Sequence, residues 1–239
     1  MIRPARWDIA RIRRRHAGYR YLLALELLIL ALQPVCRLWP PLNSLLAMAL
    51  ALLILSTLTR FSMLRATRRR AMVVGVAAIA LELVWLLLGL LGLVSPFWFT
   101  LVHLLVWLVY LGMTILRMVK SLIQEPYVTF SVVMGAASGY LLIGYSGGLL
   151  LFSIWLLNPA SFGLLQSVSG GGSDVLQLLA AGPSMFLGAF GYLTTAGTNL
   201  IQARSLVAEA ATTLITVAGQ LYVAILIALV LARYHRRRN

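Results

Sequence analysis

The chain has 239 residues, of which 61% are hydrophobic and 11% are charged, and its mean hydropathy is +0.93. Such a chain has too few polar side chains to cover a soluble fold, so the composition excludes an ordinary soluble protein and predicts an integral membrane protein. The formal net charge of +14 does not indicate nucleic-acid binding, because the basic residues gather at the borders of the apolar runs.

The first part of the chain predicts two membrane spans after a basic segment. Residues 1–18 are rich in arginine and form either an interfacial amphipathic helix or an unstructured tail. Apolar runs predict spans over residues 19–38 and 42–59, since about 20 helical residues cross a bilayer. A Trp-Pro-Pro sequence at 39–41 predicts a turn at the membrane interface between them.

Two further spans are predicted over residues 71–94 and 97–119. A voltage sensor needs several basic residues at three-residue spacing within its span, because their charges must move through the membrane field. The fourth span has only Arg117 and Lys120, near its end. Residues 19–122 are therefore predicted to form a four-helix membrane domain without voltage-sensing arginines.

Two carboxylates, Glu26 and Glu82, interrupt the first and third spans. Ionisable residues inside a span are costly, and they are by default candidates for a functional site. The simplest expectation is a buried polar contact between the first and third helices. A proton relay in a secondary transporter is the competing interpretation.

The remaining residues, 123–239, alternate apolar helices with segments of small residues. A fifth span is predicted over 126–157, where many Gly, Ala and Ser residues let helices approach closely. Residues 167–173 predict an exposed glycine-rich loop. A short helix is predicted over 183–193, with a proline at its first position. A long apolar helix, with Gly219 near its middle, ends the chain.

A short polar loop, residues 194–199, separates these last two helices. Non-helical backbone at membrane depth is tolerated only where it is buried in protein or lines a watery cavity. A polar loop between apolar helices therefore indicates a pore. An ordinary polar kink between packed helices is the alternative.

Four motifs in this half of the chain resemble one family. TTAGTN at 194–199 resembles the TTVGYG filter loop of tetrameric potassium channels. In the same ungapped register, GQLY at 219–222 is similar to the inner helix of bacterial channels of that superfamily. YLLIG at 140–144 and NPASF at 158–162 resemble the outer helix of that group and its exit. The chain is thus similar to a bacterial six-span ion channel with a divergent filter.

The resemblance implies an all-α membrane protein with six transmembrane helices, a re-entrant pore helix and a filter loop. It also implies a homotetramer around a central pore, with residues 123–239 as the pore domain. In the family, loop carbonyls replace the hydration shell of a monovalent cation. The corresponding ion-binding residues are Thr195, Ala196, Gly197, Thr198 and Asn199. The corresponding residues of the pore cavity and gate are Gly219, Gln220, Val223 and Ile227. Gly219 is either a gating bend or a glycine that admits a bulky neighbour.

The loop also departs from the family pattern. Thr198 stands at the family's tyrosine, Asn199 at its second glycine, and Leu200 at the acidic residue that follows. The aromatic ring that braces the family's loop is missing, so we expect weakened discrimination of potassium from sodium. The alternatives are a secondary transporter that uses Glu26 and Glu82, and a non-conducting membrane assembly protein.

The basic clusters predict the orientation of the chain. Arg and Lys residues gather within residues 3–20, 60–70, 117–120 and 233–238. Short loops rich in these residues stay in the cytoplasm, so both termini are expected there, in contact with anionic lipid. Together with the bacterial resemblance, this predicts the plasma (inner) membrane of a prokaryote.

No enzyme is expected. The acidic residues are scattered, and His16, His103 and His235 lack the spacing typical of a metal site. A lone Cys36 excludes a cluster of cysteine ligands. We therefore expect no catalytic residues, no resident metal and no cofactor.

Overall fold

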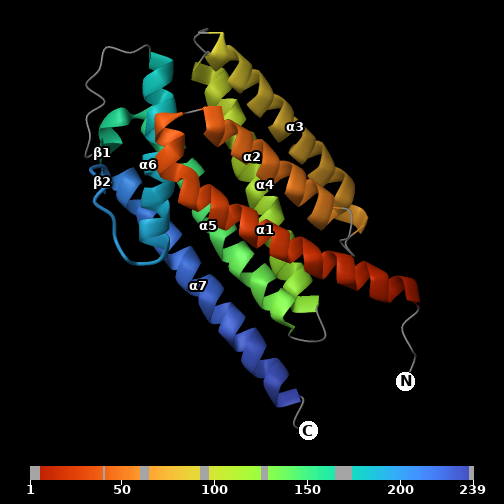
Figure 1. Ribbon diagram of the computed structural model, residues 1–239. Coiled ribbons are helices and arrows are strands. Elements are labelled where there is room, and N and C mark those ends of the chain that lie inside the picture. The colour runs from red at the N-terminus through yellow and green to blue at the C-terminus, as the bar shows by residue number, and fades with distance from the viewer. Residues whose placement is uncertain are drawn as a thin grey trace.

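The computed structural model describes residues 6–39, 41–59, 65–91, 97–124, 129–164 and 174–236. Its helices are α1 (Arg6–Leu38), α2 (Pro41–Ile54), α3 (Arg65–Leu90), α4 (Phe97–Gln124), α5 (Phe130–Leu157), α6 (Asp174–Leu193) and α7 (Leu206–Arg236). A π-helical turn, Leu55–Thr59, continues α2, and a 3₁₀ turn, Pro159–Ser161, follows α5. Figure 1 shows these elements in order along the chain.

Within the described residues, five helices are long and apolar enough to cross a membrane: Ala17–Leu38, Arg69–Leu90, Phe97–Ile123, Phe130–Leu157 and Leu206–Ala228. The prediction of a helical, membrane-embedded chain is thus confirmed. The span expected over 42–59 corresponds to a shorter apolar helix, Pro41–Thr57.

Two short strands accompany the helices without changing the all-α class. Strand β1 (Phe162–Leu164) pairs antiparallel with β2 (Ile201–Ala203), in the register Phe162 to Ala203 and Leu164 to Ile201. The backbone N–H of Arg204 extends this pairing by donating to the carbonyl of Ser161 at 2.9 Å. The small sheet therefore ties the segment after α5 to the segment before α7.

The ends of several elements differ from the prediction. Helix α1 begins at Arg6, so residues 6–18 continue into the first span as one helix. The helix expected over 183–193 begins at Asp174 instead, and Pro183 lies inside it. A proline inside a helix removes one hydrogen bond, and packing of α6 against α5, α1 and α7 offsets that loss. The loop expected over 167–173 lies outside the described residues.

Helix α5 is the centre of the molecule. It packs against α1, α4, α6 and α7, whereas α2 and α3 pack on the outer side of α1 and α4. The close packing of α5 depends on its small residues, and Gly135, Gly139, Gly144, Gly147 and Gly148 are all buried. The prediction that this glycine-rich helix is tightly packed is confirmed.

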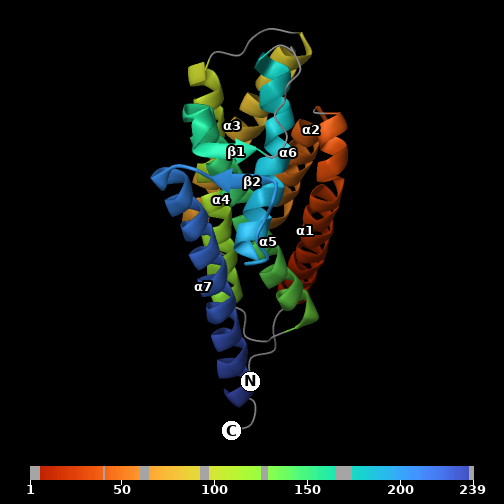
Figure 2. The same ribbon diagram turned by 90° about the vertical axis from the view of Figure 1, so that its left-hand side faces the viewer.

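Helix α6 does not run the length of the molecule. Leu193, its last residue, packs against Gly219 near the middle of α7, about 13 residues or ~20 Å from the start of that helix. Figure 2 shows α6 ending partway along α7 and the chain returning to β2 before α7 begins. The 194–199 loop thus begins beside the middle of α7 and connects the end of α6 to strand β2.

Candidate functional site

The 194–199 loop has two residues in the left-handed region of backbone conformation. The φ angle is +58° at Thr195 and +75° at Gly197. Glycine adopts this region without steric cost, whereas a residue with a side chain there costs ~1–2 kcal/mol. The conformation of Thr195 must therefore be held by contacts around it.

Hydrogen bonds to the last turn of α6 supply some of those contacts. The N–H of Thr195 donates to the carbonyl of Tyr192 and the N–H of Gly197 to that of Gly191, each at 3.1 Å. The hydroxyl of Thr194 donates to the carbonyl of Phe190 at 2.8 Å. These bonds satisfy carbonyls that a helix end leaves free, so the loop is folded onto the end of its own helix.

The neighbouring helices hold the same helix end from outside. The hydroxyl of Tyr140 on α5 donates to the carbonyl of Leu193, and the hydroxyl of Thr216 on α7 donates to that of Tyr192, each at 3.0 Å. A Cβ atom at Gly219 would lie 2.7 Å from Leu193 Cδ1 and 2.9 Å from Leu193 O. Of the two roles considered for Gly219, close packing thus has a direct structural basis.

Two side chains shape the outer half of the loop. The hydroxyl of Thr198 accepts a hydrogen bond of 3.1 Å from the N–H of Leu200. The hydroxyl of Tyr192 donates to the carbonyl of Ile201 over 3.4 Å, and the side chain of Ile201 packs against Gly188 of α6. A tyrosine on α6 therefore contacts the segment after the loop, although the loop itself contains no tyrosine.

The residues expected to bind ions or line a pore are mostly exposed in a single chain. In the loop, Thr195, Ala196, Gly197 and Asn199 are exposed, and Thr198 is partly buried. On α7, Gln220, Val223 and Ile227 are exposed, and Gly219 is buried. The structure places Gly219 against the residue that precedes the loop, and it places the other three on the free surface of α7.

The carboxylates of the first and third helices do not meet, so the predicted contact between them is wrong. Glu26 is fully buried, and its Oε1 accepts a hydrogen bond of 2.9 Å from the hydroxyl of Ser138 on α5. The backbone carbonyl of Glu26 accepts a bond from the hydroxyl of Tyr145, also on α5. Glu26 of α1 therefore bonds to α5, whereas Glu82 of α3 bonds to α4.

Glu82 pairs with a residue to which the sequence assigned no role. Its Oε2 lies 2.7 Å from Nε2 of His103 on α4, and both side chains are buried. The ring of Trp85 stacks on that of His103, with centroids 5.6 Å apart and planes at 29°. In the sequence, Glu82 and His103 are each an ionisable residue flanked by apolar residues within a span. Two such residues in neighbouring spans are candidates for a buried pair, and this is the sequence signal for the contact.

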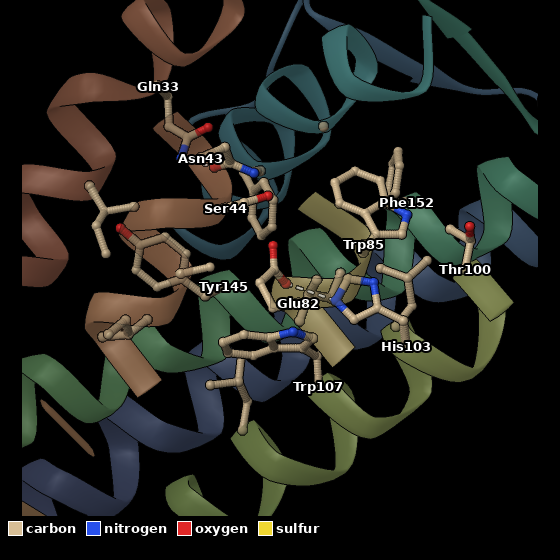
Figure 3. A pocket seen from close by; sticks show the side chains of 18 residues that line it. Gln33, Asn43, Ser44, Glu82, Trp85, Thr100, His103, Trp107, Tyr145 and Phe152 are labelled. Carbon is tan, nitrogen blue, oxygen red and sulfur yellow. Dashed lines mark hydrogen bonds and ion pairs between the residues drawn. The ribbon is translucent and has the colours of Figure 1, made fainter. Parts of the chain in front are cut away.

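The Glu82–His103 pair lines a cavity, named here the Glu82 cavity, with a volume of about 90 Å³. Side chains from α1 to α6 surround it, including Gln33, Asn43, Ser44, Glu82, Trp85, Thr100, His103, Trp107, Tyr145 and Phe152. Figure 3 shows the pair at the centre, with the rings of Trp85 and Trp107 on either side. The 194–199 loop and the Glu82 cavity are therefore two separate candidate sites.

In the described part of the chain, no group of three or more His, Cys, Asp or Glu side chains is arranged to hold a metal ion. Comparisons with protein-family models, with curated proteins and with solved structures find no match to this chain. Function is therefore inferred from the residues and their geometry.

Proposed function

We propose that the chain forms a cation channel in which the 194–199 loop, repeated around a fourfold axis, lines the narrowest part of the pore. The observation that carries this proposal is the end of α6 beside Gly219, followed by a return of the chain through a loop with left-handed residues. In a spanning protein, non-helical backbone at this depth needs a watery or protein-lined surround.

The chemistry of the loop supports cation binding through its backbone. The side chains of Thr195, Ala196, Gly197, Thr198 and Asn199 carry no charge, so carbonyl oxygens are the groups that would replace a hydration shell. The bonds that fix the end of α6 to α5 and α7 would keep the loop from collapsing when its ion leaves. Monovalent cations are the permeant ions of this proposal.

The exposed surfaces support self-association. A polar loop facing lipid would leave backbone groups without partners, and the polar side chain of Gln220 on α7 is exposed in the single chain, where lipid would offer it no hydrogen bond. Copies of the chain packed around one axis would cover the loop and place Gln220, Val223 and Ile227 toward a shared cavity. We propose a homotetramer, as in the resembling family.

The proposal also covers topology. The segment 1–18, the helices within 19–122 and the pore region 123–239 would act as three parts of one membrane protein, with α2 as a sixth, shorter span. The start of α1 and the end of α7 lie at the same end of the molecule (Figures 1 and 2). With the arginine-rich termini, this supports a cytoplasmic location for both in a prokaryotic plasma membrane, against anionic lipid.

The alternative functions have less support. A transporter relay through Glu26 and Glu82 has little geometric basis, because the two side chains pair with different helices. A proton-coupled transporter would accumulate its substrate against a gradient, whereas a channel lets ions flow only down one. An assembly protein would show neither activity.

The test is ion flux in liposomes that contain the purified protein. The expected result is passive flux of potassium and sodium. The molecular mass of the complex in detergent should be that of a tetramer. Gly197→Ala should lower the flux by about fivefold to thirtyfold, because a side chain at a left-handed residue costs ~1–2 kcal/mol. Gly112→Ala on α4 is the matched control, since no atom lies within 4 Å of its added Cβ.

Several outcomes would contradict the channel. They are a stable monomer or trimer, flux that Gly197→Ala leaves unchanged, and transport that requires a proton gradient. Absence of flux from a folded tetramer would favour the assembly protein.

A further inference from the structure

The Glu82 cavity is built from six helices and lies apart from the proposed pore. Its described lining includes Phe186 and Gly182 of α6 but no residue of the 194–199 loop. Its walls are largely aromatic and aliphatic, with Leu104, Phe152 and Phe186 among them. Ligand sites in proteins typically have this combination of apolar walls and a few converging polar groups.

Four buried polar atoms around this cavity lack a hydrogen-bond partner among the described residues. They are Nε1 of Trp85, Nε1 of Trp107, Nδ1 of His103 and Oε1 of Gln33. The residues Gln33, Trp107 and His103 are 1%, 3% and 4% exposed. Buried polar atoms are normally paired, so four of them around one cavity indicate a molecule that supplies the missing partners.

The unpaired atoms specify both donors and acceptors on that molecule. An indole N–H can only donate, so Trp85 and Trp107 require acceptor oxygens. The Gln33 carbonyl requires a donor, since its amide nitrogen faces Asn43 Oδ1 at 3.5 Å. A molecule with both an acceptor oxygen and an N–H or O–H group meets these requirements.

The charges around the cavity indicate that the molecule is neutral. The titratable side chains in its described lining are Glu82, His103 and Tyr145. Glu82 and His103 are bonded to each other, and the Tyr145 hydroxyl donates to the backbone of Glu26. A charged ligand would find no free counterion in this lining, and burying an unpaired charge is costly.

The volume limits the size of the ligand. A cavity of about 150 Å³ is known to hold benzene, which has six non-hydrogen atoms, so about 90 Å³ corresponds to one molecule of about four non-hydrogen atoms. We propose that the Glu82 cavity is a binding site for a small uncharged solute with an amide- or alcohol-like polar group and a short apolar part. This site is independent of ion conduction.

The experiment uses the full chain in detergent, with its six tryptophans replaced biosynthetically by 5-fluorotryptophan. Acetamide is the probe, and fluorine NMR follows each tryptophan resonance, assigned by single Trp→Phe substitutions. The resonances of Trp85 and Trp107 should shift saturably. The resonance of Trp98, which is 72% exposed on α4, should not.

Two variants test the hydrogen bond and the volume. Trp107→Phe keeps an aromatic ring but removes the N–H, so the dissociation constant read at Trp85 should rise about tenfold. Trp98→Phe, the matched control, should leave it unchanged. Ala47→Leu adds a larger side chain to the cavity wall and should abolish the saturable shift. The titration of the unsubstituted protein decides the question even if a variant does not fold.

Acetate and tetramethylammonium are charged probes of similar size, and neither should give a saturable shift. A saturable shift with tetramethylammonium but not with acetamide would overturn the proposal in favour of a cation site. An acetamide shift that stays linear in concentration, or that affects Trp98 as much as Trp107, would mean that only water occupies the cavity. That result would also overturn the proposal.

Discussion

Thr198 illustrates how one residue changes the bracing of the 194–199 loop. Its hydroxyl accepts a bond from the N–H of Leu200, within the loop's own turn. A tyrosine at this position would instead extend a ring toward the surrounding helices. The segment after the loop is held by Tyr192 through a longer bond of 3.4 Å. The bracing is therefore local, and it is weaker than a ring packed behind the loop.

This bracing leads to a prediction about selectivity. The channel that we propose should, without substitutions, discriminate poorly between potassium and sodium, because a loop that relaxes around the smaller ion loses the size-based part of discrimination. Replacing Thr198→Tyr together with Asn199→Gly should move the reversal potential toward that of potassium. Reversal potentials of the reconstituted protein in mixed potassium and sodium solutions measure this.

Thr216→Val is a control for that experiment, because it changes a threonine beside the same helix end and leaves the loop sequence intact. It should not improve selectivity. Strong potassium selectivity in the unsubstituted protein would refute the weak-brace explanation while leaving the channel proposal standing.

At the scale of elements, the contact between α6 and α7 depends on the absence of a side chain at Gly219. The added Cβ would lie within 3 Å of both the side chain and the carbonyl of Leu193. The two helices must therefore separate, or Leu193 must leave its buried position, if any larger residue is placed there. The hydrogen bond from Thr216 to Tyr192 would be strained by the same movement.

Gly219→Ala should lower the free energy of unfolding by ~1–3 kcal/mol, the usual cost of overpacking. The measurement is reversible unfolding in mixed micelles, followed by circular dichroism. Gly112→Ala, where the added Cβ meets no atom within 4 Å, should leave stability unchanged or raise it by about 0.5–1 kcal/mol, because alanine favours a helix over glycine. Equal effects of the two substitutions would contradict the close-packing role.

At the scale of the whole molecule, the arrangement of charge predicts orientation. The basic clusters lie at the ends of spans, and the start of α1 and the end of α7 share one end of the molecule (Figure 1). Strand β2 immediately precedes α7, so it lies beside the start of that helix, far from its C-terminal end. Its residue Gln202 is exposed. Charge and fold thus indicate the same side for both termini.

Single cysteines in intact cells test this orientation. In a Cys36→Ala background, Arg3→Cys, Arg69→Cys and Arg237→Cys should resist a membrane-impermeant maleimide, because they belong to basic clusters that we propose to be cytoplasmic. Gln202→Cys should react. Lysed cells, in which all four should react, provide the control for accessibility. Labelling of position 3 or 237 from outside would refute the predicted topology.

The sequence by itself determined the class of the protein and most of its elements. Apolar length and the positions of prolines, glycines and arginines are local properties, so they predicted membrane helices close to α3, α4, α5 and α7. The polar 194–199 loop was also visible as a break between apolar helices, whereas the sequence left two roles open for Gly219 and the structure supplied the packing contact with Leu193. Helix α6 was predicted too short, because Pro183 suggests a helix start and only its packing partners carry the helix through it.

Only the tertiary structure decided which polar residues meet. Glu26 bonds to Ser138, and Glu82 bonds to His103, because packing turns each carboxylate toward α5 or α4 rather than toward the other. The Glu82 cavity has the same origin, since its wall combines side chains from six helices whose order in the sequence does not fix their order in space. Hydrophobic length specifies that a helix enters the membrane, but contacts among distant segments determine which face it turns to each neighbour.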